Sequence, residues 1–175
     1  MKVLLHTCCA PCASQCITVL HALNHEVTLF FSNANIAPEE EYHLRLDSVR
    51  QLAHLMHVPL IVDETDHRAW LNEVARGFEG EPERGARCTR CFMYSLQRTV
   101  NALNNSGFDA FTTSLSISPH KSSALLFDLG HTLGGERFLA LDFKKQNGFQ
   151  KSVEQARSLN LYRQRYCGCE WSMRP

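Results

Sequence analysis

Residues 2–31 read KVLLHTCCAPCASQCITVLHALNHEVTLFF, and this stretch decides the fold class. The apolar run at 2–6 predicts a short buried strand, the segment from Pro11 to Asn24 predicts a helix, and 26–31 predicts a second strand. Two strands joined by a helix indicate a βαβ unit with parallel strands. The same stretch holds four of the eight cysteines of the chain, two of them adjacent.

The alternation of strands and helices continues to the end of the chain. A helix is expected to begin near Pro38, because the glutamates at 39–41 suit the first turn of a helix. Further strands are predicted at 59–62, 109–113 and 138–142, and further helices at 67–76, at 91–105, between the later strands and after Phe149. We therefore predict one α/β domain over residues 1–175, with a parallel sheet flanked by helices.

Composition is that of an ordinary globular protein, with 44% hydrophobic and 21% charged residues. No apolar run is long enough to cross a membrane, and the start of the sequence does not resemble a signal peptide. We expect a cytoplasmic protein without a membrane partner. Thiols stay reduced in the cytoplasm, so clustered cysteines there indicate metal or redox chemistry.

Charge is balanced overall but not locally. The formal net charge is zero, yet residues 63–83 carry seven acids against two arginines, and residues 144–174 carry seven basic residues against two acids. A basic segment is typical of a phosphate-binding surface and also of a solvated charged face. Both interpretations stay open from the sequence.

Ligands of open parallel sheets bind beyond the carboxyl ends of the strands. Four predicted loops at these ends carry polar or sulfur-bearing side chains: Thr7-Cys8-Cys9, SNAN at 32–35, SLSISPHK at 114–121 and DFKK at 142–145. We expect them to meet on one rim of the molecule.

The remaining cysteines form two pairs. RCTRC places Cys88 and Cys91 in a C-x-x-C, and YCGCEW places Cys167 and Cys169 on either side of a glycine. Three arginines surround the C-x-x-C: Arg84, Arg87 and Arg90. Their charge is expected to lower the pKa of the thiols and so favour metal-binding thiolates.

Four thiolates could hold either a zinc ion or an iron–sulfur cluster: Cys8, Cys9, Cys88 and Cys91. Adjacent cysteines are unusual for zinc and favour a cluster. A thioredoxin-like redox pair is a third interpretation of the C-x-x-C, although it follows a long acidic loop rather than a strand. Cys12 is close enough in sequence to help hold an additional iron, whereas Cys16 is expected to be a buried thiol.

Taken together, these motifs resemble those of the QueH-type epoxyqueuosine reductase family. The matching stretches are HTCCAPC, NIAPEEEY, RCTRCF, TTSLSISPHK, DFKK and YRQRYCGC, in this order from Lys2 to Met173. The chain departs from the family in FFSNANI, where FYNPNI is expected, and at Ser95, where an arginine often stands. The resemblance implies a Rossmann-like fold of the nucleotide-hydrolase type. It also implies an oxidoreductase that reduces epoxyqueuosine to queuosine at the anticodon wobble position of tRNA, the last step of queuosine biosynthesis.

The resemblance further implies roles for individual residues. It makes Cys8, Cys9, Cys88 and Cys91 the ligands of a [4Fe-4S] cluster and makes Cys167 and Cys169 a redox-active disulfide pair. The partners would be tRNA carrying epoxyqueuosine and an electron donor.

Several other residues are candidates for substrate binding: Asn33, Asn35, Tyr42, Ser118, Lys121, Lys144 and Lys145. The asparagines could bind a base edge or a sugar hydroxyl, and the lysines could bind phosphate. Three side chains are candidates for donating a proton: His6, Tyr42 and Asp142.

Two functions from other classes stay open. A nucleotide-dependent tRNA-modifying transferase would carry a glycine-rich phosphate loop after the first strand, where this chain has TCCAPC. A zinc-stabilised binding module would be colourless, whereas an iron–sulfur cluster absorbs visible light.

Overall fold

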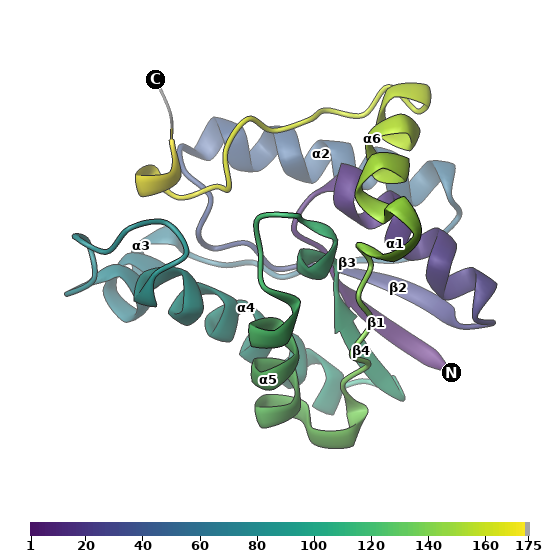
Figure 1. Cartoon of the computed structure of the whole chain (residues 1–175), viewed down its shortest axis with the longest axis horizontal. Helices are drawn as coiled ribbons and strands as arrows, with labels where there is room; N and C mark the ends of the chain where they lie inside the picture. Colours follow the sequence, from purple (N-terminus) through teal and green to yellow (C-terminus); the bar gives the residue numbers. More distant parts are fainter. Residues whose placement is uncertain (174–175) are drawn as a thin grey trace.

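The core of the molecule is a four-stranded parallel sheet, seen in a computed structural model that describes residues 1–173 (Figure 1). The strands are β1 (Lys2–His6), β2 (Glu26–Phe31), β3 (Leu60–Val62) and β4 (Ala110–Thr113). They lie in the order β3-β2-β1-β4, which is the order of Rossmann-like sheets. The predicted α/β class is confirmed.

Helices cover both faces of this sheet. The α-helices are α1 (Ala10–Ala22), α2 (Glu39–Leu55), α3 (His67–Trp70), α4 (Ala86–Asn104), α5 (Ser123–Gly134) and α6 (Gly148–Ser158). Figure 1 shows α1, α2 and α6 on one side of the strands and α4 and α5 on the other. Short helices connect them: η1 (Leu71–Ala75), η2 (Ser114–Ile117), η3 (Gly135–Arg137), η4 (Lys145–Asn147) and η5 (Glu170–Ser172).

The alternation of side chains along β1 builds two cores. Val3 and Leu5 pack with α1, α2 and α6, whereas Leu4 packs with α4, α5 and Phe111 of β4. All three β1 side chains are fully buried. A strand buried on both faces is continuously apolar, which explains why 2–6 predicts it so clearly.

The predicted fifth strand at 138–142 is wrong. Only Phe138 forms a bridge, to Phe111 of β4. The Leu141 amide then donates to the Leu139 carbonyl at 2.9 Å, which curls the backbone away from a strand. The hydroxyls of Thr112 and Ser116 bind the carbonyls of Leu139 and Leu141. Hydrogen bonds from side-chain hydroxyls thus take the place of the backbone hydrogen bonds that a fifth strand would form. The segment stays beside β4 without joining the sheet.

Two predicted helices also need correction. The helix expected at 91–105 begins five residues earlier, at Ala86, so both cysteines of the C-x-x-C lie in its first two turns. The helix expected at 67–76 is a single α-helical turn followed by the π-helical η1. The helices at the remaining predicted places are confirmed.

After α6 the chain, yellow in Figure 1, runs back along α2 and ends beside α3. It contributes Cys169 and Trp171 to a third apolar cluster, which also contains Trp70 and Cys91. The C-terminal cysteines are therefore carried back to α4. Arg174, which belongs to the basic segment of the sequence, lies outside the described residues. Over residues 1–173, no helix has both the length and the apolar character needed to cross a bilayer.

Candidate metal and redox site

A cavity of about 460 Å³ opens at the carboxyl ends of the strands. It lies where the chain order reverses between β1 and β4, the place where such sheets bind ligands. Six cysteines line it: Cys8, Cys12, Cys88, Cys91, Cys167 and Cys169. Three segments that are far apart in the sequence therefore bring their sulfurs to one space.

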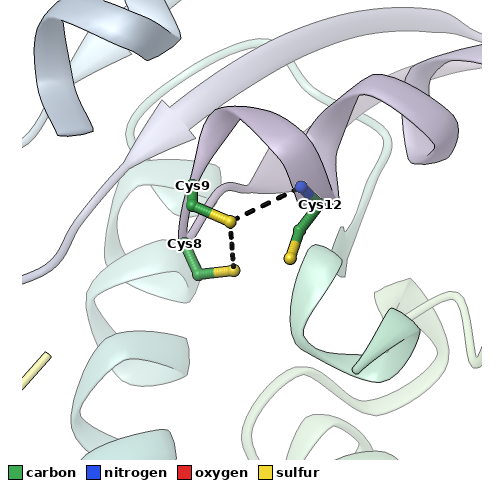
Figure 2. Close-up of side chains that lie close together, drawn as sticks. All are labelled: Cys8, Cys9 and Cys12. Atoms are coloured by element: carbon green, nitrogen blue, oxygen red, sulfur yellow. Dashed lines mark hydrogen bonds between the residues drawn. The ribbon is translucent and has the colours of Figure 1, made fainter. Parts of the chain in front are cut away.

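The first group of sulfurs is held by the start of α1 (Figure 2). Cys9 is the N-cap residue, and its Sγ accepts a hydrogen bond from the Cys12 amide at 3.4 Å. Pro11 in the first turn needs no amide partner there. The Cys8 and Cys9 sulfurs lie 3.8 Å apart, and the sulfurs of Cys8, Cys9 and Cys12 all lie within 4.8 Å of one another. This group is able to hold a metal ion.

Such close thiols cannot all ionise without a cation. Hydrogen bonds with Cys12 and Cys9 lower the pKa of Cys8 well below its usual value, against the effect of burial. The hydrogen bond with Cys12 lowers the pKa of Cys9, but the bond with Cys8, burial and the Cys8 charge together raise it to about 12. The same neighbours raise the pKa of Cys12. Of the three, Cys8 is the residue whose surroundings favour the thiolate, and a bound metal would favour the thiolate at the other two as well.

Ser114, which follows the neighbouring strand β4, fixes Cys8. Its Oγ accepts from the Cys8 amide at 3.1 Å and donates to the Cys8 sulfur at 3.3 Å. Ser114 directly follows β4, so this pair spans the point where the strand order reverses. Sequence analysis missed this role of Ser114, because a serine after a strand carries no signal of its own.

The C-x-x-C lies at the start of α4. The Arg84 amide, on a residue with φ of 70°, donates to the Cys88 sulfur at 3.2 Å. Arg87 and Arg90 instead use their guanidinium groups on main-chain carbonyls: Arg87 on Phe78, Glu79 and Glu81, Arg90 on Glu73 and Val74. They fix the acidic segment around α4. The expected fall in thiol pKa is wrong for Cys91, whose pKa is raised by burial and by the charges of Cys167 and Cys169.

The third group of sulfurs lies on the C-terminal segment. Gly168 has φ of 155°, and its carbonyl accepts from the Ala37 amide at 3.0 Å. A Cβ at this position would lie 2.7 Å from Nδ2 of Asn35, so only glycine fits without displacement. Cys167 is exposed toward the cavity and Cys169 is buried. Both are free thiols in this structure.

Arg45 holds this segment against α2. Its side chain is 2% exposed and donates to the carbonyls of Cys167 at 2.7 Å and Tyr166 at 3.0 Å. Glu41 balances its charge at 2.7 Å and also accepts from Tyr162 Oη. Sequence analysis quoted Glu41 within NIAPEEEY but missed Arg45, although the i,i+4 spacing of the two on one helix is a signal for an ion pair.

The other predicted site residues fall into two sets. The first set lines the cavity: His6, Asn33, Asn35, Ser118 and Lys121. Asn33 also uses its amide on the Thr7 carbonyl at 2.9 Å. His6 is buried between Thr113 and the Ser32 carbonyl, and burial lowers its pKa.

The second set is not part of the described cavity wall: Tyr42, Asp142, Lys144 and Lys145. Tyr42 packs edge-on against Phe31, with ring centres 5.5 Å apart. Lys144 turns its ammonium inward onto the chain, whereas Lys145 is exposed. Asp142 accepts from the Ser123 hydroxyl and the Lys144 amide. Cys16 is fully buried, as expected.

Comparison with known proteins identifies the family to which these cysteine-bearing segments belong. The family model described as "Epoxyqueuosine reductase QueH" matches residues 3–175. The chain belongs to the epoxyqueuosine reductase QueH family. The relative from Streptococcus pyogenes serotype M1, named epoxyqueuosine reductase QueH, is 36% identical over 180 residues, which cover 98% of this chain and 70% of the relative. The relative of the same name from Thermotoga maritima is 33% identical, covering 98% of this chain and 90% of the relative. The QueH match thus includes all three cysteine-bearing segments.

We expect Arg45→Met to release the C-terminal segment, because it removes two hydrogen bonds and leaves Glu41 buried without its cation. The free energy of unfolding should fall by about 3–5 kcal/mol. Hydrogen exchange of the amides at 162–169 should accelerate, as measured by mass spectrometry. Arg50→Met is the matched control, since its exposed pair with Asp47 on the same helix contributes about 0–1 kcal/mol. Unchanged exchange at 162–169 in Arg45→Met would show that Arg45 does not hold the segment.

Proposed function

We propose that this chain reduces epoxyqueuosine to queuosine in tRNA, acting in the cytoplasm as a single iron–sulfur reductase domain. The observation that carries the proposal is the convergence of six cysteine sulfurs on one cavity. The shared name of the QueH relatives supplies the substrate. Free thiols throughout the described chain suit a reducing compartment.

We assign the cofactor as a [4Fe-4S] cluster held by Cys8, Cys9, Cys88 and Cys91. The donor set supports this, because thiolates are the usual ligands of such clusters. Cys8, Cys88 and Cys91 line the cavity, and the buried Cys9 sulfur lies 3.8 Å from that of Cys8. Cys12 stands close to Cys8 and Cys9 and could hold an additional iron. When bound, the cluster supplies one-electron transfer.

We assign Cys167 and Cys169 as the redox-active pair. Conversion of an epoxide to an alkene breaks two carbon–oxygen bonds, releases water, and consumes two electrons and two protons. Oxidation of two thiols to a disulfide supplies both electrons and both protons, so the reaction balances. An external electron donor must then return two electrons and two protons to the disulfide. Cys167 faces the cavity, and desolvation by the surrounding protein raises its pKa.

The rim of the cavity suits an RNA loop. Arg163 and Arg165 are exposed there, and Arg84 lies nearby beside His120 at 3.1 Å. Basic side chains around a sulfur-lined cavity would bind phosphates while one nucleoside enters. Asn33, Asn35 and Ser118 line the same space and would contact that nucleoside.

The two other functions lose support. TCCAPC after β1 caps α1 with a sulfur rather than forming a glycine-rich phosphate loop, which weighs against a nucleotide-dependent transferase. A structural zinc site would account for four cysteines but not for a further pair on the same cavity.

Cysteine replacements should distinguish the cluster ligands from Cys12, which could hold an additional iron. Cys88→Ala and Cys91→Ala should lose iron, sulfide and the absorption near about 400 nm. Cys12→Ala should retain the cluster and lose any additional iron. Metal and sulfide analysis of anaerobically purified protein measures both, with the buried Cys16→Ala as control. A loaded, active Cys88→Ala protein would refute the ligand assignment.

Replacement of the C-terminal pair should leave the metal in place. Cys167→Ser/Cys169→Ser should keep the visible spectrum of the wild type but fail to sustain turnover. Alkylation with mass spectrometry should find a 167–169 disulfide in the oxidised wild type. Loss of iron from the double variant, with no disulfide in the wild type, would instead make both residues metal ligands.

Charge reversal at the rim should reduce the salt dependence of tRNA binding. Each lost single-strand phosphate contact lowers the slope of log K against log salt by about 0.7. We expect this for Arg163→Glu and Arg165→Glu, as measured by filter binding across a salt series. Arg157→Glu, an exposed residue of α6, is the control. An equal fall in all three variants would mean that the basic segment attracts RNA only diffusely.

A further inference from the structure

The loop at 116–123 is fastened from inside by Lys144. Its Nζ donates to the Ser116 carbonyl at 2.8 Å, the Lys121 carbonyl at 3.1 Å and the Ser123 hydroxyl at 2.6 Å. Asp142 completes the arrangement, since it accepts from Ser123 at 3.1 Å and lies 3.8 Å from Lys144. Three bonds from one ammonium fix the backbone at Lys121. Lys144, which the sequence predicts as an RNA contact, thus uses its ammonium for hydrogen bonds within the protein.

The fastened loop presents the Lys121 side chain to the cavity wall. Within residues 1–173, its ammonium makes no hydrogen bond to a protein group, and its electrostatic partners are the thiols, Cys167 first and Cys8 next. Burial lowers the pKa of Lys121, but the charges of the surrounding cysteines outweigh burial and raise it. The cavity wall that carries the cysteines therefore also carries a cation without a hydrogen-bonded anion.

Three of the neighbouring arginines are engaged elsewhere, and the guanidinium of Arg84, which also lines the cavity, lies beside His120 at 3.1 Å. Arg87 and Arg90 bind main-chain carbonyls, and Arg45 is paired with Glu41. Thiolate ligands give a metal centre negative charge, and a nearby fixed cation favours the reduced form, which carries one more electron. Lys121 is placed to supply that cation.

We propose that Lys121 raises the reduction potential of the metal centre held by the cavity cysteines, and that Lys144 is the residue that positions it. The inference rests on the proposed function, because it requires a redox-active centre in the cavity. It gives Lys121 a task that differs from the phosphate contact suggested by the sequence.

The test compares midpoint potentials of the anaerobically purified, iron-loaded full chain by spectroelectrochemistry. Lys121→Gln should weaken one-electron reduction about tenfold, a shift of about 59 mV to more negative potential. Lys121→Arg should keep most of the wild-type potential, because it keeps the charge. Lys144→Met should shift the potential in the same direction by less. Lys151→Gln removes one exposed charge from α6 and is the control.

A midpoint potential of Lys121→Gln equal to that of Lys151→Gln overturns the inference. A reduced salt slope for tRNA in Lys121→Gln with an unchanged potential also overturns it and favours the phosphate contact. Failure of Lys121→Gln to hold iron, while Lys121→Arg holds it, supports the charge role. A wild-type chain without iron and sulfide overturns the proposed function and this inference together, whereas a loaded wild type whose potential ignores Lys121 overturns the inference alone.

Discussion

The site depends on the hydrogen bonding of β1 on both of its edges. β1 pairs in parallel with β2 and β4, with Leu5 opposite Leu29 and Thr112, so the three strands end at the same level. The Thr7 amide still reaches the Phe30 carbonyl at 2.9 Å, one residue beyond the strand. Only then does the chain turn into α1. The sulfurs of the first group are therefore aimed by the backbone register and not by a flexible loop.

A cysteine at the N-cap combines two tasks at this turn. Serine, aspartate and asparagine are the usual N-cap residues, because their oxygen accepts an amide at the start of the helix. Here Cys9 accepts with sulfur, and the positive end of the helix dipole favours a thiolate at the same place. Without a bound cation, however, three thiols this close cannot all lose their protons, as the opposite pKa shifts of Cys8 and Cys12 show. The geometry thus suits a bound cation better than it suits three free thiols.

Much of this arrangement is predictable from the sequence, because it depends on local patterns. The continuous apolar runs predict β1 and β2 to the residue, and the rule for parallel sheets brings the loops after β1, β2 and β4 to one rim. The prediction fails where long-range contacts decide. Residues 138–142 are apolar enough for a strand, but the hydroxyls of β4 and η2 take their carbonyls. The course of the C-terminal segment depends on Arg45, a contact across more than a hundred residues.

Long-range contacts also decide which charged side chains are accessible, and this changes how the basic segment at 144–174 is interpreted. A count of lysines and arginines treats each as a free surface charge, yet Lys144 is partly buried and turns its ammonium onto the chain, and this burial lowers its pKa. Lys151 and Arg157 are exposed on α6, and among the basic residues described between 144 and 173 only Arg163 and Arg165 line the cavity. A cation that is partly removed from water forms its hydrogen bonds within the protein, because its desolvation is costly otherwise. Position in the fold, and not the number of charges, therefore separates the residues available to RNA from those that build the site.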